Sequence, residues 1–460
     1  MTTAKTTNTK KAATKATGTG TRAKKTTGTT SAQQPAALIP DIATDSPTSA
    51  ADSAANDGTT AYSEQVLVTV QQDALTKAIE TVSASIPQTQ GHAALLDRLR
   101  LTTNQAGQTL TLSGFNLIVG MEVTIAANVE GSGDWTVAAS KLLNLLRNFP
   151  SGPVTLSWTV GKTLSIVSRT AGPFEVTTRL ADDCPAIPVP EAPQRFTLID
   201  FQWGLKGAIL CAGAEDFRCV HMLFWADTQA TEDAPLKAGV TLTSTKKEAL
   251  LVFYHDVPDG TDLELPDRTA SVAGESLRRL VGLLGDQRCE VELDTVSTED
   301  VVVRFVLTPT SKQKLVTETP TGVTTIVTCR TDKVEAMNGS GFMPPDPLPV
   351  EISVDRHQMI AALQRQAVIT NKTAAVTLNV GSNEVTLTSE GAGSDNGTDT
   401  LSAQVQGAPM TIKFSPDFLL ECLQALQSNQ ARLSFSGSTE AAYIRDSERE
   451  TLFFVLAPAG

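Results

Sequence analysis

After Tyr62, apolar and polar residues alternate over short stretches separated by Gly, Asn and Asp, which is typical of β-strands. Six stretches break this alternation with apolar residues three and four positions apart, a spacing that predicts amphipathic helices. Three of them each follow a short strand, at residues 73–86, 200–212 and 355–369. The other three each follow a strand and precede a hairpin, at residues 139–148, 274–284 and 415–428.

The predicted helices recur at a nearly constant interval. Those that begin at 139, 274 and 415 are separated by 135 and 141 residues, and each carries a crowded set of large apolar side chains. In the other three, an apolar residue lies five positions past the end of the preceding strand: Leu75, Trp203 and Met359. The sequence therefore predicts an α+β fold of three tandem copies, each with two helices packed on antiparallel sheets. Such an array can curve, and two curved arrays can close a ring.

The domain boundaries follow from these repeats and from composition. We expect a tail at residues 1–61 and three domains at 62–190, 191–347 and 348–460. The tail is built of Thr, Ala, Lys, Gly and Ser with few large apolar residues, so burial cannot offset the entropy of ordering it. This composition predicts disorder and a weak affinity for anionic polymers.

Composition and charge exclude several classes of protein. The longest apolar runs, at 249–254 and 301–307, are far shorter than the roughly 18 residues of a spanning helix. The six cysteines show no metal-binding spacing and are predicted to be reduced core residues in a cytoplasmic protein. Residues 1–60 hold seven basic and four acidic groups, which leaves a net charge of −16 on the remainder. Any contact with nucleic acid must therefore be local.

Motifs for catalysis or cofactor binding are weak. Gly161-Lys162-Thr163 lacks the first glycine of a phosphate loop and fits a hairpin turn between strands at 154–160 and 164–168. The four histidines are isolated in the sequence and are expected on the surface or in loops rather than as metal ligands. We predict no enzyme activity, no metal and no cofactor.

Several segments resemble one known family. Residues 110–117, 135–150 and 174–176 resemble the first domain of the bacterial sliding clamp, the beta subunit of DNA polymerase III. Residues 410–420 and the ending 453–458 resemble its third domain, and the resemblance covers roughly residues 64–460. The middle copy is the most divergent of the three.

The resemblance implies a fold and a function. Members of this family form a head-to-tail homodimeric ring of six similar domains, with helices lining the hole, so this chain would be a crescent-shaped half of a ring. The ring encircles duplex DNA independently of sequence, serves as a processivity factor in DNA replication, and has the replicative DNA polymerase and the clamp loader as partners. An alternative from another class is a β-rich structural or assembly protein built of three repeats.

The resemblance also implies a channel lined with cations that meet phosphates. The candidates are Lys77, Lys141, Arg147, Lys206, Arg218, Arg278, Arg279, Arg356, Arg365 and Lys372. For each of them, a solvated helix charge is an equally good interpretation. The last predicted helix carries Asp417 and Glu421 and no cation, and Gln90 stands where the family has a DNA-contacting arginine.

Ring closure in the family buries apolar residues of the first domain's edge strand against the third domain's first helix. The matching positions are Phe174 and Val176, facing Val368 and Ile369. Either pair could instead belong to an ordinary core, although the alternation from Phe174 to Thr177 favours one exposed strand face that needs a partner.

The family's second working surface is an apolar pocket that takes short peptides from partner proteins. The matching positions are Thr245, Leu250, Val252, Val455, Leu456 and Pro458, with Val220, Pro345 and Leu348 aligned less closely. A terminal core strand is the alternative interpretation for Val455 and Leu456. The family's Gly-His-Arg is replaced by Lys247-Glu248-Ala249, so the rim of the pocket differs from the family pattern.

Overall fold

The structure is a computed structural model. It describes residues 63, 65–86, 96–159, 161, 163–190, 193–198, 201–214, 217–226, 238–246, 249–256, 268–285, 288–294, 302–308, 323–335, 337, 342, 347–370, 375–391, 395–448 and 451–459. The tail expected at residues 1–61 lies outside these residues, so its predicted disorder stays a prediction.

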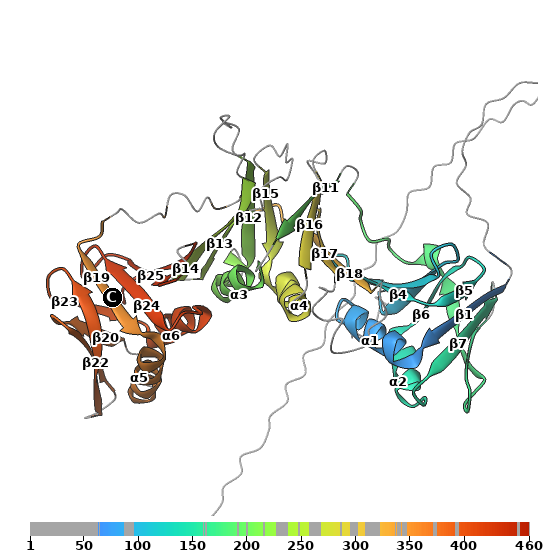
Figure 1. Ribbon diagram of the computed structural model, residues 1–460, viewed down its shortest axis with the longest axis horizontal. Helices are drawn as coiled ribbons and strands as arrows, with labels where there is room; N and C mark the ends of the chain where they lie inside the picture. Colours follow the sequence, from blue (N-terminus) through green and yellow to red (C-terminus); the bar gives the residue numbers. More distant parts are fainter. Residues whose placement is uncertain are drawn as a thin grey trace, which may run out of the picture. The chain divides into compact units, whose positions relative to one another are not determined.

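Six α-helices lie in the described residues, and each coincides with one of the stretches that the apolar spacing indicates (Figure 1). They are α1 (Gln72–Ser83), α2 (Ala139–Arg147), α3 (Phe201–Cys211), α4 (Gly274–Leu284), α5 (Arg356–Ile369) and α6 (Pro416–Ala425). The last helix ends earlier than expected, because the backbone of Leu426 is extended and its side chain is buried. Among the described residues, no helix has the length and apolar character needed to span a membrane.

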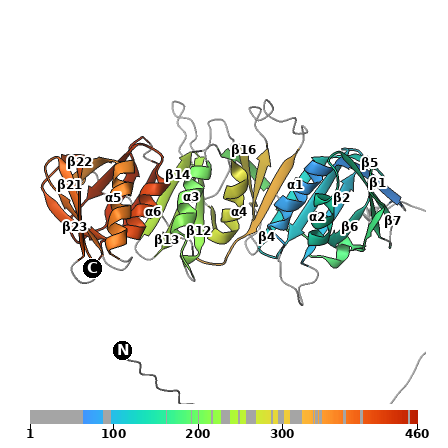
Figure 2. The ribbon, with the colours of Figure 1, turned by 90° about the horizontal axis from the view of Figure 1, so that it is seen from below.

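The helices pack in pairs, α1 with α2, α3 with α4, and α5 with α6 (Figure 2). Every helix comes directly after a strand, in the same order three times along the chain. The first helix of each pair also contacts strands of its own repeat, so its apolar face is buried against the sheet. The three tandem copies that the sequence predicts are thus confirmed.

A five-stranded antiparallel sheet belongs wholly to the first repeat. In spatial order its strands are β5 (Asn128–Glu130), β1 (Gln65–Gln71), β7 (Pro153–Thr159), β8 (Leu164–Ser168) and β9 (Phe174–Val176). The turn between β7 and β8 contains Gly161 at φ +73°, where a residue without a Cβ is favoured. The hairpin that the sequence predicts in place of a phosphate loop is confirmed.

A nine-stranded antiparallel sheet runs from the first repeat into the second. In spatial order its strands are β10 (Thr178–Leu180), β6 (Asp134–Ala138), β2 (Arg98–Asn104), β3 (Thr109–Phe115), β4 (Val119–Ala126), β18 (Thr324–Arg330), β17 (Val302–Thr308), β16 (Arg288–Asp294) and β11 (Pro193–Leu198). The repeats join where β4 pairs with β18, with Met121 opposite Val327. Both side chains are buried, so this junction is part of the core.

A twelve-stranded antiparallel sheet joins the second repeat to the third. In spatial order its strands are β15 (Arg268–Ala273), β12 (Cys219–Ala226), β13 (Ala238–Lys246), β14 (Ala249–Asp256), β26 (Leu452–Leu456), β25 (Ala442–Asp446), β24 (Gln430–Phe435), β19 (Val350–Asp355), β22 (Asn396–Gln406), β21 (Glu384–Glu390), β20 (Val376–Val380) and β23 (Met410–Phe414). The last strand of the chain, β26, pairs with β14 of the second repeat, with Leu251 opposite Phe454.

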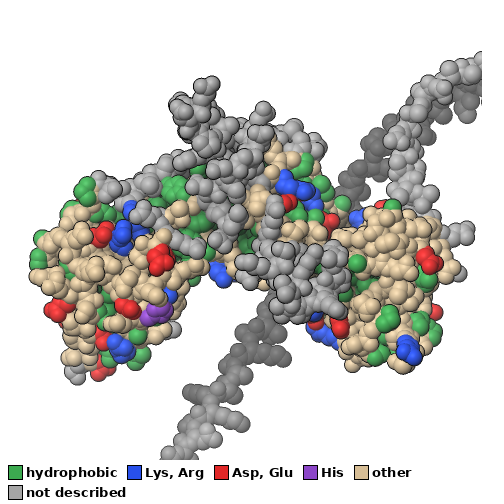
Figure 3. Space-filling model, viewed as in Figure 1, with side chains coloured by type: hydrophobic (Ala, Val, Ile, Leu, Met, Phe, Trp, Pro, Cys, Tyr) green, Lys and Arg blue, Asp and Glu red, His purple; other side chains and the backbone are tan. Residues whose placement is uncertain are grey.

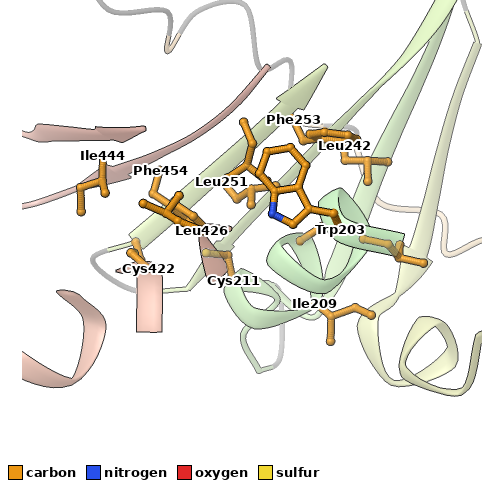
Figure 4. Close-up of a cluster of buried hydrophobic side chains, with 14 of the residues drawn as sticks. Trp203, Ile209, Cys211, Leu242, Leu251, Phe253, Cys422, Leu426, Ile444 and Phe454 are labelled. Atoms are coloured by element: carbon orange, nitrogen blue, oxygen red, sulfur yellow. The ribbon is translucent and has the colours of Figure 1, made fainter. Parts of the chain in front are cut away.

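Trp203 fixes the contact between α3 and the third repeat (Figure 4). Its indole packs edge-to-face on Phe253 with the ring centroids 5.6 Å apart, and its Nε1 donates to the carbonyl of Ala425, at the end of α6, over 3.0 Å. An aromatic pair of this geometry contributes about 0.5–1.5 kcal/mol beyond its buried area. A Cβ at Gly204 would lie 2.1 Å from Phe253, so only glycine allows α3 to approach this closely.

The polar and sulfur-containing residues of the core follow the sequence expectations only in part. No disulfide joins any of the six cysteines, all of which lie in the described residues; five are buried as expected, but Cys184 is only half-buried. His221 is also a correction, because it is buried on β12 rather than placed on the surface or in a loop.

Candidate functional site

Four of the candidate DNA-binding cations are exposed on successive helices. They are Lys77 on α1, Lys141 on α2, Lys206 on α3 and Arg278 on α4. Each stands opposite the buried stripe of its helix, and none forms an ion pair with another described residue. Each of these cations therefore places its charge at the surface of its helix.

Two further candidates are exposed but already paired with acids. Arg147 Nη2 donates to Glu80 Oε1 over 2.9 Å, which joins α2 to α1. Arg365 Nη2 donates to Asp399 Oδ1 over 2.6 Å, which joins α5 to β22. The hydrogen bond from Arg365 lowers the pKa of Asp399 and raises that of Arg365. A phosphate would have to compete with a carboxylate at both positions.

Arg356 and Arg279 are half-buried, and their assignment to the channel stays a prediction. Arg356 Nε donates to the carbonyl of Ser428 over 2.6 Å, and Arg356 Nη1 donates to the carbonyl of Leu423 over 3.4 Å. The guanidinium group of Arg356 thus caps carbonyl groups at the C-terminal end of α6. Arg279 is half-buried and its charge acts on the buried thiol of Cys329, whose pKa burial raises to about 12.

Arg218 is also engaged away from the helices. Its Nε donates to Asp332 Oδ2 over 3.1 Å, and this hydrogen bond raises the pKa of Arg218. Lys372 and Gln90 lie outside the described residues. Of the ten cations that the resemblance indicates, Lys77, Lys141, Lys206 and Arg278 are exposed and form no ion pair with another described residue, and all four lie on helices of the first two repeats.

On the face of the molecule in Figure 3, basic and acidic side chains are interspersed and neither sign forms a continuous patch. This agrees with the acidic net charge of the sequence. An attraction for DNA would have to come from particular positions rather than from the whole surface.

The residues expected at the dimer interface fall into two groups. Phe174 is 44% exposed on β9, an outermost strand of the five-stranded sheet, and packs edge-to-face on Phe149 with the centroids 5.5 Å apart. Val176 is only 1% exposed and belongs to the core of the first repeat, which matches the ordinary core that the sequence offers as the alternative interpretation. Near the end of α5, Val368 is 75% exposed and Ile369 is half-buried. An exposed apolar side chain therefore lies in each of the two regions.

The twelve-stranded sheet carries an apolar cluster on the face opposite the main core, and we call it the outer patch. Its buried members are Leu250 and Val252 of β14 and Phe453 of β26, packed by Tyr254, Met337, Tyr443 and Val455. The strand register places Leu250 opposite Val455 and Val252 opposite Phe453. Two chain segments about 200 positions apart thus build one apolar surface.

Two of the expected pocket residues lie on the face of the sheet opposite the outer patch. Val220 and Leu456 are fully buried in the main core, because successive residues of a strand point to opposite faces. Thr245 is half-buried, and its Oγ1 donates to the carbonyl of Ala249 over 3.3 Å. Leu348 and Pro458 are half-buried, whereas Pro345, Lys247 and Glu248 lie outside the described residues.

Sequence reasoning missed Phe453, Tyr254, Tyr443 and Met337. A signal for two of them, Phe453 and Tyr254, is present, since β26 and β14 read as continuous apolar runs rather than as alternating strands. Such runs indicate that both faces of a strand are covered. Nothing near Met337 in the sequence indicates its contact with β14 and β26.

The chemistry of these surfaces is that of binding. Among the described residues, no three His, Cys, Asp or Glu side chains converge as metal ligands would. The exposed cations can bind phosphate oxygens through charge, and the outer patch can receive apolar side chains.

Comparisons with known proteins agree with this geometry. The model of the N-terminal domain of the DNA polymerase III beta subunit matches residues 66–188, and that of its C-terminal domain matches residues 344–459. The beta sliding clamp of Synechocystis sp. is 23% identical over 386 residues, which cover 80% of this chain and 92% of that protein. The beta sliding clamp of Escherichia coli is 23% identical over 408 residues, which cover 85% and 98%.

Solved structures share the fold. The sliding clamp of Bacillus subtilis superposes with a TM-score of 0.70 at 17% identity, covering 86% of this chain and 99% of that one. The clamp of Pseudomonas aeruginosa bound to griselimycin gives a TM-score of 0.70 at 18% identity, covering 86% and 99%. With two of its three repeats matched by models of one family and its whole fold shared with solved clamps, the chain belongs to the DNA polymerase III beta subunit family.

Proposed function

We propose that this protein is a DNA sliding clamp, a homodimeric ring that encircles duplex DNA and acts as a processivity factor. The threefold repetition of a helix pair on antiparallel sheets, in a member of this family, is the observation that carries the proposal. In this proposal the clamp domains span residues 62–190, 191–347 and 348–460, and each chain is a crescent that forms half of the ring.

A ring holds DNA by topology, so it needs neither base recognition nor high affinity. An acidic protein can therefore act on DNA, provided that some cations face the phosphates. Lys77, Lys141, Lys206 and Arg278 suit this role because they are exposed and unpaired among the described residues. Such contacts would be weak and exchangeable, which permits sliding.

Ring closure would join the first repeat of one chain to the third repeat of its partner. The strands β9 and β23 are outermost in their sheets, and an outermost strand favours pairing with another chain. On β23, the carbonyl of Lys413 already accepts a hydrogen bond from the N–H of Ala459 over 2.8 Å. Phe174 on β9 offers apolar surface to the same contact, as do Val368 and Ile369 on α5. In a two-chain ring this contact occurs twice.

The outer patch would receive short peptides from the replicative DNA polymerase and the clamp loader. A buried apolar centre bordered by tyrosines is the kind of surface that takes a few hydrophobic anchors. The altered rim at Lys247-Glu248-Ala249 predicts a peptide preference different from that of clamps with Gly-His-Arg. The protein itself would perform no catalysis and would work in the cytoplasm.

Primer extension by the replicative polymerase of the same cell tests the proposed function. With polymerase limiting and an excess of unlabelled trap DNA, adding the protein and its clamp loader should lengthen the products made in one binding event. A Val455→Glu variant, which places a charge on the outer patch, should leave the products short. Product lengths that do not respond to the wild-type protein would contradict the proposal and favour a structural role.

A further inference from the structure

Residues 331–335 follow β18 and bond to β15, and Met337 packs against the outer patch; we call these residues the strap. Two backbone groups of the strap bond to β15. The N–H of Asp332 donates to the carbonyl of Ser271 over 2.7 Å, and Ser271 Oγ donates to the carbonyl of Val334 over 3.3 Å. The start of the strap is therefore fixed to the edge of the sheet.

The side chain of Asp332 adds a second attachment, on β12. Its Oδ2 accepts hydrogen bonds from Arg218 Nε and from Cys219 Sγ, both over 3.1 Å. Ser271 is itself held in place, since its Oγ lies 2.9 Å from Nδ1 of the buried His221. Two hydrogen bonds to one carboxyl oxygen thus hold the strap on β12, and we call the side chain of Asp332 the pin of the strap.

The register of the sheet connects this pin to the outer patch. Ser271, His221, Thr243, Val252 and Phe453 are cross-strand neighbours in a single row over β15, β12, β13, β14 and β26. The strap is pinned at the Ser271 end of this row. At the other end, Met337 packs against the cluster that contains Val252 and Phe453.

The outer patch is closed in this arrangement. Val252 is 0% exposed, Phe453 2% and Leu250 7%, so an apolar anchor from another protein cannot reach the centre without displacing a side chain. Tyr254, Tyr443 and Val455 belong to strands, whereas Met337 lies in a segment without regular structure. An unbranched methionine also adapts and withdraws easily.

We propose that the strap is a built-in cover of the partner-binding pocket. In the free protein Met337 occupies the place of a peptide anchor, and the Asp332 pin keeps it there. A partner peptide must displace Met337, so release of the pin raises the affinity for peptides. This inference rests on the proposed function only in identifying the outer patch as the peptide pocket.

The cover is tested without any partner by the reactivity of a cysteine at the centre of the patch. In the full-length protein carrying Leu250→Cys, the rate of alkylation by N-ethylmaleimide is measured on the peptide that contains residue 250. Adding Met337→Ala or Asp332→Asn should raise this rate about tenfold, because each removes an interaction that holds the cover closed. Two independent variants keep the test informative if one of them does not fold.

Matched substitutions in the same segment serve as controls. Val334→Ala removes an exposed apolar side chain of the strap, and Glu335→Gln removes an exposed acid, and neither touches the pin or the patch. Both should leave the alkylation rate unchanged. Equal rates in the wild-type, Met337→Ala and Asp332→Asn backgrounds would overturn the inference.

Binding of griselimycin distinguishes the hypothesis that the strap is a cover from the hypothesis that the outer patch is the peptide pocket. If the patch is the pocket, Asp332→Asn and Met337→Ala should bind griselimycin more tightly than the wild-type protein, in proportion to their alkylation rates. Weaker binding by both variants would make Met337 a wall of the pocket and would overturn its role as a cover. Faster alkylation with no griselimycin binding in any variant would support the cover and count against the pocket of the proposed function.

Discussion

The four exposed helix cations, which form no ion pair with another described residue, predict how DNA binding by the proposed clamp depends on salt. The fourfold variant replaces Lys77, Lys141, Lys206 and Arg278 by Gln in the same chain. Each cation that neutralises a phosphate contributes about 0.9 to the slope of log Kobs against log salt concentration. Four such groups in each chain make eight in a dimer, so the slope should become shallower by up to about 7 if all of them contact DNA.

The assay is fluorescence anisotropy of a labelled linear duplex titrated with the full-length protein over a series of salt concentrations. The seven basic residues of the tail are present in every variant and contribute equally to each slope. The control variant combines Arg147→Gln and Arg365→Gln. These substitutions remove cations that already form ion pairs with Glu80 and Asp399, so they should change the slope less. A slope unchanged by the fourfold variant, or changed as much by the control, would refute the assignment of these cations.

Three further predictions concern the junction, the ring and the response to pH. Gly204→Ala should lower the free energy of unfolding by about 1–3 kcal/mol in urea titrations, because the added Cβ would lie 2.1 Å from Phe253. The control is Gly282→Ala in α4, whose added Cβ has no atom within 4 Å and should raise the free energy of unfolding by about 1 kcal/mol. Equal effects of the two substitutions would contradict the packing argument. Val368→Glu should turn the dimer into monomers in sedimentation at micromolar concentration, and a variant that stays dimeric would show that this side chain lies outside the interface. Burial opposes ionisation of Asp446, but backbone N–H donors including Ser428 lower its pKa overall. The ionised carboxylate therefore stabilises the fold above the unfolded pKa of about 3.9, and this stabilisation is lost as the pH falls through the lower folded pKa. Asp446→Asn should reduce the free energy of unfolding at pH 7 and make that free energy fall less steeply in acid.

The helices of this protein could be predicted from the sequence because their signals are local. The limits of α4 were predicted to the residue, since a row of leucines at helical spacing ends at Gly285, whose φ is +43°. The hairpin at Gly161 is equally local. Repetition of these patterns at a nearly constant interval was sufficient to predict three similar units.

The site could be predicted only in part, because its residues are brought together by long-range pairing. The strand β26 reads Leu-Phe-Phe-Val-Leu and is apolar on both faces, so the sequence does not show that Val455 faces the outer patch and Leu456 the core. Only the register with β14 decides this. Likewise, nothing local in the sequence indicates that Arg356 bonds to the carbonyl of Ser428, 72 positions away.

Retention on DNA of different topology tests the central claim most directly. The protein is loaded onto closed circular DNA by its clamp loader, separated from free protein by gel filtration in high salt, and the DNA is then cut once with a restriction enzyme. A sliding clamp should stay with the circle and leave after the single cut, because a closed ring can slide off only at an end. Protein that leaves the intact circle as fast as the cut one, or that stays on both, would contradict the account.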